Sequence, residues 1–108
     1  MAGDFREPDW KRLRRLQPLA LERFCQRVLD EISRLAADAG QGSHERYRAV
    51  YRLLQDRDER LADAFDNPRR SAALVQLARI RAEGLLSEEE FAGFSPETRA
   101  AVRAFLEL

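Results

Sequence analysis

Nucleophilic or metal chemistry in this sequence of 108 residues would have to use very few side chains. Cys25 is the only cysteine and His44 the only histidine. A cysteine and a histidine can form a nucleophilic pair, but Cys25 falls on the apolar stripe of a predicted helix, where a free cysteine behaves as a small hydrophobic residue. A zinc site needs several such ligands, and the scattered glycines form no phosphate-binding loop. We therefore expect no catalytic residue, no metal and no cofactor.

Asp58 is the carboxylate with the most unusual predicted position. It falls between Leu54 and Leu61, on the apolar side of its helix. A carboxylate buried there must be paired or hydrogen-bonded, because an isolated charge in a core is very costly. Arg69 and Arg70 follow just after the next turn and are the candidate partners. We expect a polar cluster of these three residues, either as a clamp between two helices or as a binding site for a small polar ligand.

A basic patch lies near the start of the chain, opposite the apolar residues of a short predicted helix. It consists of Lys11, Arg12, Arg14 and Arg15. Such a segment can contact nucleic-acid phosphates, anionic lipid headgroups or an acidic protein surface, although it is too short to hold a membrane alone. Residues 82–108 carry six glutamates and two arginines, so the oppositely charged ends could instead pack together within the fold or across a dimer.

Helical periodicity positions these residues. Apolar residues recur at spacings of three and four, whereas no segment alternates with a period of two. We expect helices over about 9–17, 18–39 and 43–65, with a break or kink at Pro18 because proline disfavours helical geometry in the residue before it. Asn67-Pro68 predicts the start of a fourth helix that ends at Gly84. Ser87 with Glu90 has the spacing of a capping box, and Ser95-Pro96 predicts the start of a last helix.

The predicted core collects the apolar positions of these helices. It comprises Trp10, Phe24, Cys25, Val28, Ile32, Val50, Leu54, Leu61, Phe65, Leu74, Leu77, Phe91, Val102 and Phe105. We expect an all-α fold, a compact bundle or orthogonal array of five to six helices with no sheet. Residues 1–108 are expected to form a single helical domain, with residues 1–8 as a flexible or loosely packed arm.

One segment resembles a known family. Residues 77–91, LARIRAEGLLSEEEF, are similar to the helix–Gly–Leu/Ile–Ser/Thr–Glu–Glu–Phe hairpin of SHOCT-type short C-terminal domains. The resemblance implies a tight helical hairpin around Gly84. The continuation through Ser95-Pro96 departs from the family pattern, which goes on into a lysine-rich helix.

Composition narrows the classes of function. The sequence is 44% hydrophobic and 35% charged, and its net charge is zero. Nothing therefore indicates bulk attraction to nucleic acid or to anionic lipid, and we expect no membrane association. A lone cysteine and the absence of an apolar signal segment favour the cytoplasm.

We expect a small non-catalytic interaction or regulatory module of bacterial type. Its partner is expected to be a protein, and a second copy of the chain in a homodimer is one candidate. The alternatives are a nucleic-acid-binding domain that uses the basic patch, and a ligand-binding protein or enzyme built around Asp58.

Overall fold

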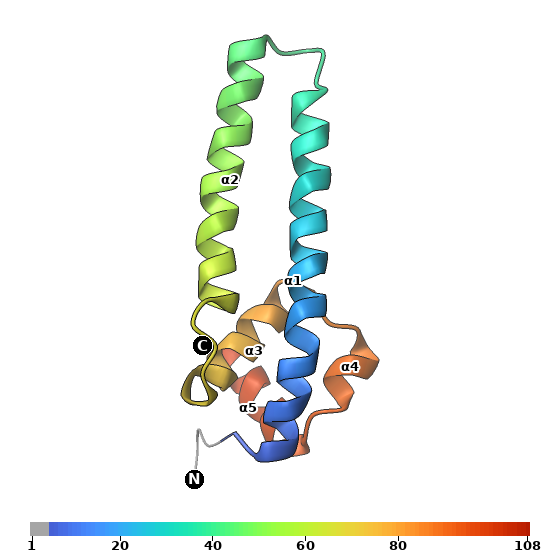
Figure 1. Cartoon of the computed structure of the whole chain (residues 1–108), viewed down its shortest axis with the longest axis vertical. Helices are drawn as coiled ribbons and strands as arrows, with labels where there is room; N and C mark the ends of the chain where they lie inside the picture. The colour runs from blue at the N-terminus through green and yellow to red at the C-terminus, as the bar shows by residue number, and fades with distance from the viewer. Residues whose placement is uncertain (1–4) are drawn as a thin grey trace.

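A computed structural model describes residues 5–108 of the chain. Its elements are α1 (Glu7–Ala36), α2 (Ser43–Phe65), a 3-10 turn η1 (Arg70–Ala72), α3 (Ala73–Ala82), α4 (Glu88–Ala92) and α5 (Pro96–Leu106). The prediction of an all-α fold with five to six helices and no sheet is confirmed for this part of the chain. The molecule measures 55 × 24 × 23 Å, because the long α1–α2 hairpin extends well beyond a base of shorter helices (Figure 1).

α1 is one continuous helix of 30 residues, so the predicted break at Pro18 is wrong. Proline within a helix removes one backbone hydrogen bond and destabilises the helix by about 3 kcal/mol. Burial on both sides of Pro18 offsets this loss, since Leu13, Ala20 and Phe24 are all buried against the base. The tertiary contacts of α1 therefore hold it helical through the proline.

The first described residues are packed rather than loose. Phe5 is buried, and the guanidinium of Arg70 donates hydrogen bonds to the Phe5 carbonyl oxygen (2.6 Å) and to the Glu7 carboxylate (2.7 Å). The predicted arm is therefore wrong for residues 5–8, while residues 1–4 lie outside the described residues. Sequence alone missed this contact because its partner, Arg70, is distant along the chain.

The connection from α2 to α3 is longer than predicted. Asn67 has a φ of +53°, a left-handed conformation that asparagine tolerates better than most residues. Asn67 therefore does not cap a helix, and regular α-helix begins only at Ala73. The buried Gln76 side chain donates a hydrogen bond to the Asp66 carbonyl oxygen at 2.7 Å, which ties this connection to α3.

The core lies in the base, where α3 and α5 pack against each other and against the lower half of α1 (Figure 1). The largest fully buried side chains are Leu13, Leu77, Ile80, Leu85, Phe94 and Val102. Of the predicted core residues, Leu54 alone is classed as exposed, and the others are buried or partly buried. The helical faces were therefore predicted correctly. The exception is the apolar face of α2 around Leu54, which is more exposed than expected.

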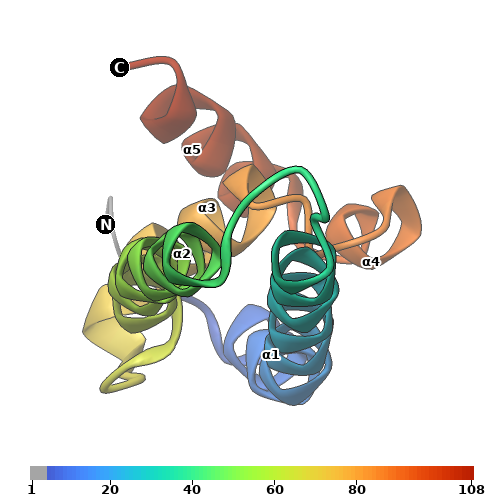
Figure 2. The ribbon, with the colours of Figure 1, turned by 90° about the horizontal axis from the view of Figure 1, so that it is seen from above.

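Two capped turns shape the end of the chain. Gly84, with a φ of +70°, ends α3 and lets Leu85 N donate to the Ile80 carbonyl oxygen, as in a Schellman motif. The Ser87–Glu90 capping box begins α4 as predicted, and the Ser95 hydroxyl caps α5. α4 and α5 then lie on different sides of the hairpin axis when the molecule is viewed along it (Figure 2).

Candidate functional site

An apolar groove runs between α1 and α2 along the hairpin. One hollow of about 460 Å³ is lined by Phe24, Cys25, Val28, Leu29, Ile32, Tyr51, Leu54, Gln55, Arg57, Asp58 and Leu61. A second, of about 480 Å³, continues toward the tip and is lined by Ala36, Ser43, Arg46, Tyr47, Val50, Tyr51 and Leu54. Tyr51 and Leu54 line both hollows, so the two form one continuous surface. We call it the hairpin groove.

Large apolar side chains of the hairpin groove face solvent. Leu29 is 56% exposed, and on α2 the exposed fractions are 69% for Tyr47, 55% for Tyr51 and 45% for Leu54. Their spacing places them on the same helical faces as the buried apolar residues of α1 and α2. They remain exposed because each hairpin helix has one neighbouring helix at this height, whereas the lower half of α1 also contacts the base (Figures 1 and 2).

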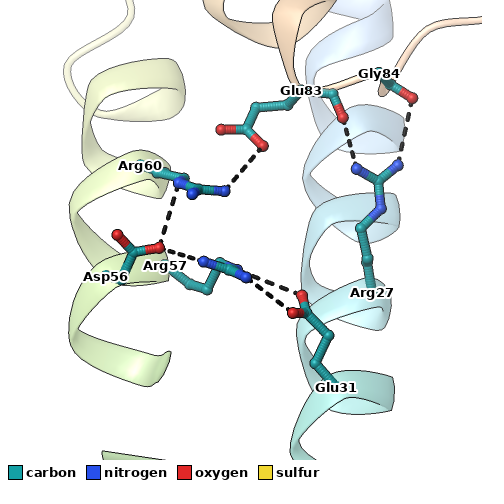
Figure 3. A network of polar contacts seen from close by, with 7 residues as sticks. All are labelled: Arg27, Glu31, Asp56, Arg57, Arg60, Glu83 and Gly84. Carbon is teal, nitrogen blue, oxygen red and sulfur yellow. Dashed lines mark hydrogen bonds and ion pairs between the residues drawn. The ribbon is translucent and has the colours of Figure 1, made fainter. Parts of the chain in front are cut away.

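A polar network sets the alignment of the two hairpin helices (Figure 3). The Arg57 guanidinium forms a two-pronged ion pair with the Glu31 carboxylate, with distances of 2.8 and 3.3 Å, and also contacts Asp56. The hydrogen bonds from Arg57 lower the pKa of Glu31 below its usual value, and burial opposes this only in part. Because a planar guanidinium fits a carboxylate in one orientation, this pair fixes the register of α1 against α2.

The same network joins the hairpin to the base. Arg60 pairs with Asp56 (3.3 Å) and with Glu83 at the end of α3 (3.8 Å). From α1, Arg27 donates hydrogen bonds to the backbone carbonyl oxygens of Glu83 (2.6 Å) and Gly84 (3.3 Å). These carbonyls belong to the end of a helix, where backbone acceptors lack partners within the helix. Polar contacts therefore join α1 to α2 within the hairpin and also join the hairpin to the end of α3.

Asp58 does not form the predicted buried cluster. Its side chain is exposed at the rim of the hairpin groove, and the ion pairs of the described residues do not join it to Arg69 or Arg70. Arg69 is exposed, and Arg70 is used by Phe5 and Glu7. The prediction of a buried Asp58 is therefore wrong. The helical face was correct, but no third element within residues 5–108 covers it.

The basic patch is only partly free. Lys11, Arg14 and Arg15 are exposed, and the Arg14 guanidinium lies 5.4 Å from the centre of the Trp10 ring. Arg12 is half-buried, lies 6.0 Å from the centre of the Phe94 ring and occupies the space beside Gly93. Arg12 therefore serves packing between α1 and the α4–α5 connection, which leaves three cations on the surface.

Asp9, in the first turn of α1, is a buried carboxylate. It accepts hydrogen bonds from Ser95 N (3.0 Å), Ser95 Oγ (2.7 Å) and Thr98 Oγ1 (2.7 Å). Burial raises the pKa of the Asp9 carboxyl, but these hydrogen bonds and the nearby charge of Arg12 together hold it below its usual value. Because its carboxylate accepts these hydrogen bonds from Ser95 and Thr98, Asp9 joins α1 to α5. Asp9 does not line the hairpin groove.

A second internal anchor joins α1 to α4. Arg23 donates two hydrogen bonds to the Glu90 carboxylate (2.7 and 3.0 Å) and one to the Leu85 carbonyl oxygen (2.7 Å). The Arg23 hydrogen bond, with the backbone N–H of Ser87, lowers the pKa of Glu90 to about 2. Both anchors therefore hold the base together, and the hairpin groove is left as the candidate site.

Comparison with known proteins identified no family: the chain matches no protein-family model, no curated protein and no solved structure. The resemblance of residues 77–91 to a SHOCT-type hairpin therefore remains local. Among residues 5–108, no helix combines the length and apolar character needed to cross a membrane.

Proposed function

We propose that the chain is a small non-catalytic interaction module that binds another protein through the hairpin groove. The observation that carries this proposal is the exposure of Leu29, Tyr47, Tyr51 and Leu54 along one continuous surface. Contiguous apolar surface of this kind is uncommon on monomeric proteins and is typical of interaction sites. Tyrosine is also enriched at protein interfaces, where its ring is buried and its hydroxyl forms hydrogen bonds.

The rigidity of the hairpin supports the same proposal. The Arg57–Glu31 pair and the contacts of Arg27 and Arg60 with the end of α3 hold the two helices in a fixed arrangement before any partner binds. A preformed surface loses less conformational entropy on association than a flexible one. The lone cysteine supports a cytoplasmic setting as part of this proposal.

Site-specific photocrosslinking tests the proposal. A benzophenone amino acid is placed at Tyr51 in the hairpin groove and, as a matched control, at the exposed Leu106 on α5, in cells that express the chain. We expect protein adducts from position 51 that disappear when Leu54→Asp is added, and none that depend on Leu54 from position 106. Equal adducts from both positions, or none from position 51, would contradict binding through the groove.

The nucleic-acid alternative has weaker support. Arg12 packs on Phe94, so within the basic patch only Lys11, Arg14 and Arg15 could contact phosphates, and the net charge of the chain is zero. Affinity for nucleic acid arises mainly from many such contacts and falls steeply with salt. Titration of duplex and single-stranded DNA at low salt, with the wild-type chain and the Arg14→Ala/Arg15→Ala variant, distinguishes this alternative from groove binding.

A further inference from the structure

The edge of α2 beside the hairpin groove carries a row of charges that changes sign along its length. Arg48, Arg52, Gln55, Glu59 and Asp63 follow at spacings of four, three, four and four, which places them along one side of a helix. The two arginines lie toward the hairpin tip and the two carboxylates toward the base, with a neutral glutamine between them. None of these four charged residues takes part in an ion pair within residues 5–108.

Such a row is complementary to itself when two copies run in opposite directions. A two-fold axis near Gln55 places Arg52 of one copy opposite Glu59 of the other, and Arg48 opposite the region of Asp63. Each contact occurs twice by symmetry, as it must in a two-fold dimer. Asp58, on the groove rim, then also faces the arginine half of the second copy.

The size of the surface fits a stable dimer. α2 contains 23 residues and, at about 1.5 Å per residue, is about 34 Å long. Two adjacent helices about 10 Å apart present a face about 20 Å wide, so each copy offers at most roughly 700 Å², since α3 covers the lower end of α2. Specific interfaces bury about 800 Å² on each partner, and the groove supplies the apolar centre that such an interface needs.

We propose that the occupant of the hairpin groove is a second copy of this chain, arranged antiparallel so that two hairpins form a four-helix bundle. This inference rests on the proposed function, because it names the partner of the same surface. The exposed apolar stripes of α1 and α2 become the core of the bundle, and the α2 charge rows form its edge.

A charge-swap experiment tests the arrangement. Sedimentation equilibrium measures the mass of the purified chain, 12.5 kDa as a monomer, across the micromolar range. Arg52→Glu alone and Glu59→Arg alone each place like charges opposite one another at two sites, so each should weaken the dimer roughly tenfold. An equimolar mixture of the two variants pairs opposite charges again and should recover the wild-type affinity, as should the double variant Arg52→Glu/Glu59→Arg.

Apolar variants locate the interface independently. Leu54→Asp in the groove should abolish the dimer, whereas Leu106→Asp on α5 should not, although the two leucines are similarly exposed (45% and 43%). Circular dichroism and a cooperative melt establish that both variants fold. A dimer sensitive to Leu106→Asp but not to Leu54→Asp would overturn the proposal. So would a mixture of the Arg52→Glu and Glu59→Arg variants that does not recover the wild-type dimer affinity.

The crosslinking experiment separates the two proposals. Adducts from position 51 at twice the chain mass, together with recovery in the mixed sample, support the second copy. A monomer throughout the micromolar range with Leu54-dependent adducts to a different protein overturns the second copy and leaves the interaction module intact. A monomer without such adducts overturns both.

Discussion

At the residue scale, the most informative feature is the division between charges paired inside the chain and charges exposed to solvent. Asp9, Arg23 and Glu90 have their partners inside the chain. Charged groups taken out of water are tolerated when hydrogen bonds replace their hydration. By contrast, Arg52 and Glu59 have no ion-pair partner in the described chain. The first group stabilises the fold, and the second is available to a binding partner.

Acid should weaken the fold through Glu90. Its pKa is lowered from 4.5 to about 2, so its contribution to stability is complete above about pH 4.5 and is lost as the pH falls toward 2. Because the Arg23 side chain is partly exposed, solvent screening reduces the stabilisation of the fold by the Arg23–Glu90 pair to about 1 kcal/mol. Glu90→Gln should therefore lower the free energy of unfolding at pH 7 by about this amount, with a smaller loss at pH 3. Urea titrations at both pH values measure it.

The exposed Glu89 provides the control for this prediction. Glu89→Gln removes the same charge from the neighbouring position of α4, where the side chain is exposed. A loss of stability at pH 7 equal to that of Glu90→Gln would indicate a general charge effect rather than the Arg23 pair. The pH dependence of the wild-type chain would then need another source.

At the scale of elements, local signals decide how well each boundary could be predicted. The Ser87 capping box, the Ser95 cap and the α2 limits rest on contacts within a few residues, and the sequence located them correctly. The Pro18 break and the Asn67 helix start were wrong. In both cases distant contacts, such as burial of Ala20 and the bond from Gln76 to Asp66, outweighed the local preference.

Gly84 gives a direct test of a local signal. A side chain at a φ of +70° is strained, and leaving the left-handed region would break the Leu85 N to Ile80 O hydrogen bond. Gly84→Ala should therefore lower the free energy of unfolding by about 1–2 kcal/mol. Gly84→Asn is the matched control, because asparagine tolerates the left-handed region better than alanine and should lose less stability at the same position. Equal melting temperatures for the two variants would contradict the strained turn.

At the scale of the whole molecule, the candidate site was the least predictable part. Helical periodicity predicts that Val50, Leu54 and Leu61 share one helical face but cannot show what covers that face. The same periodicity places Asp58 on this side, with Arg69 and Arg70 at the next turn as its expected partners. The structure shows instead that the face extends beyond the base (Figure 1). Periodicity predicts which residues share a side, whereas the presence of a third layer depends on how distant helices pack.

This arrangement predicts that truncation of an apolar side chain destabilises the fold more in the base than in the hairpin. Leu77 is fully buried in the base, so Leu77→Ala should lower the free energy of unfolding by about 2–5 kcal/mol. Leu54 is 45% exposed, and Leu54→Ala should lower it by less than about 1 kcal/mol when measured at nanomolar concentration, where the chain is expected to be monomeric. Denaturant titrations by fluorescence of Trp10 provide both values. Similar losses would contradict the division into a packed base and an open hairpin.

The carboxylate of Asp9 and its donors on Ser95 and Thr98 are separated by 86 and 89 residues along the chain. Contacts between distant parts of a sequence form late, because a long loop must close first. A ribosome releases the start of α1 long before it has made α5, whereas α1 and α2 are complete once residue 65 has emerged. We therefore expect the hairpin to close first on the nascent chain. The Asp9 carboxylate then stays hydrated on the nascent chain until α5 has been synthesised and packs over it.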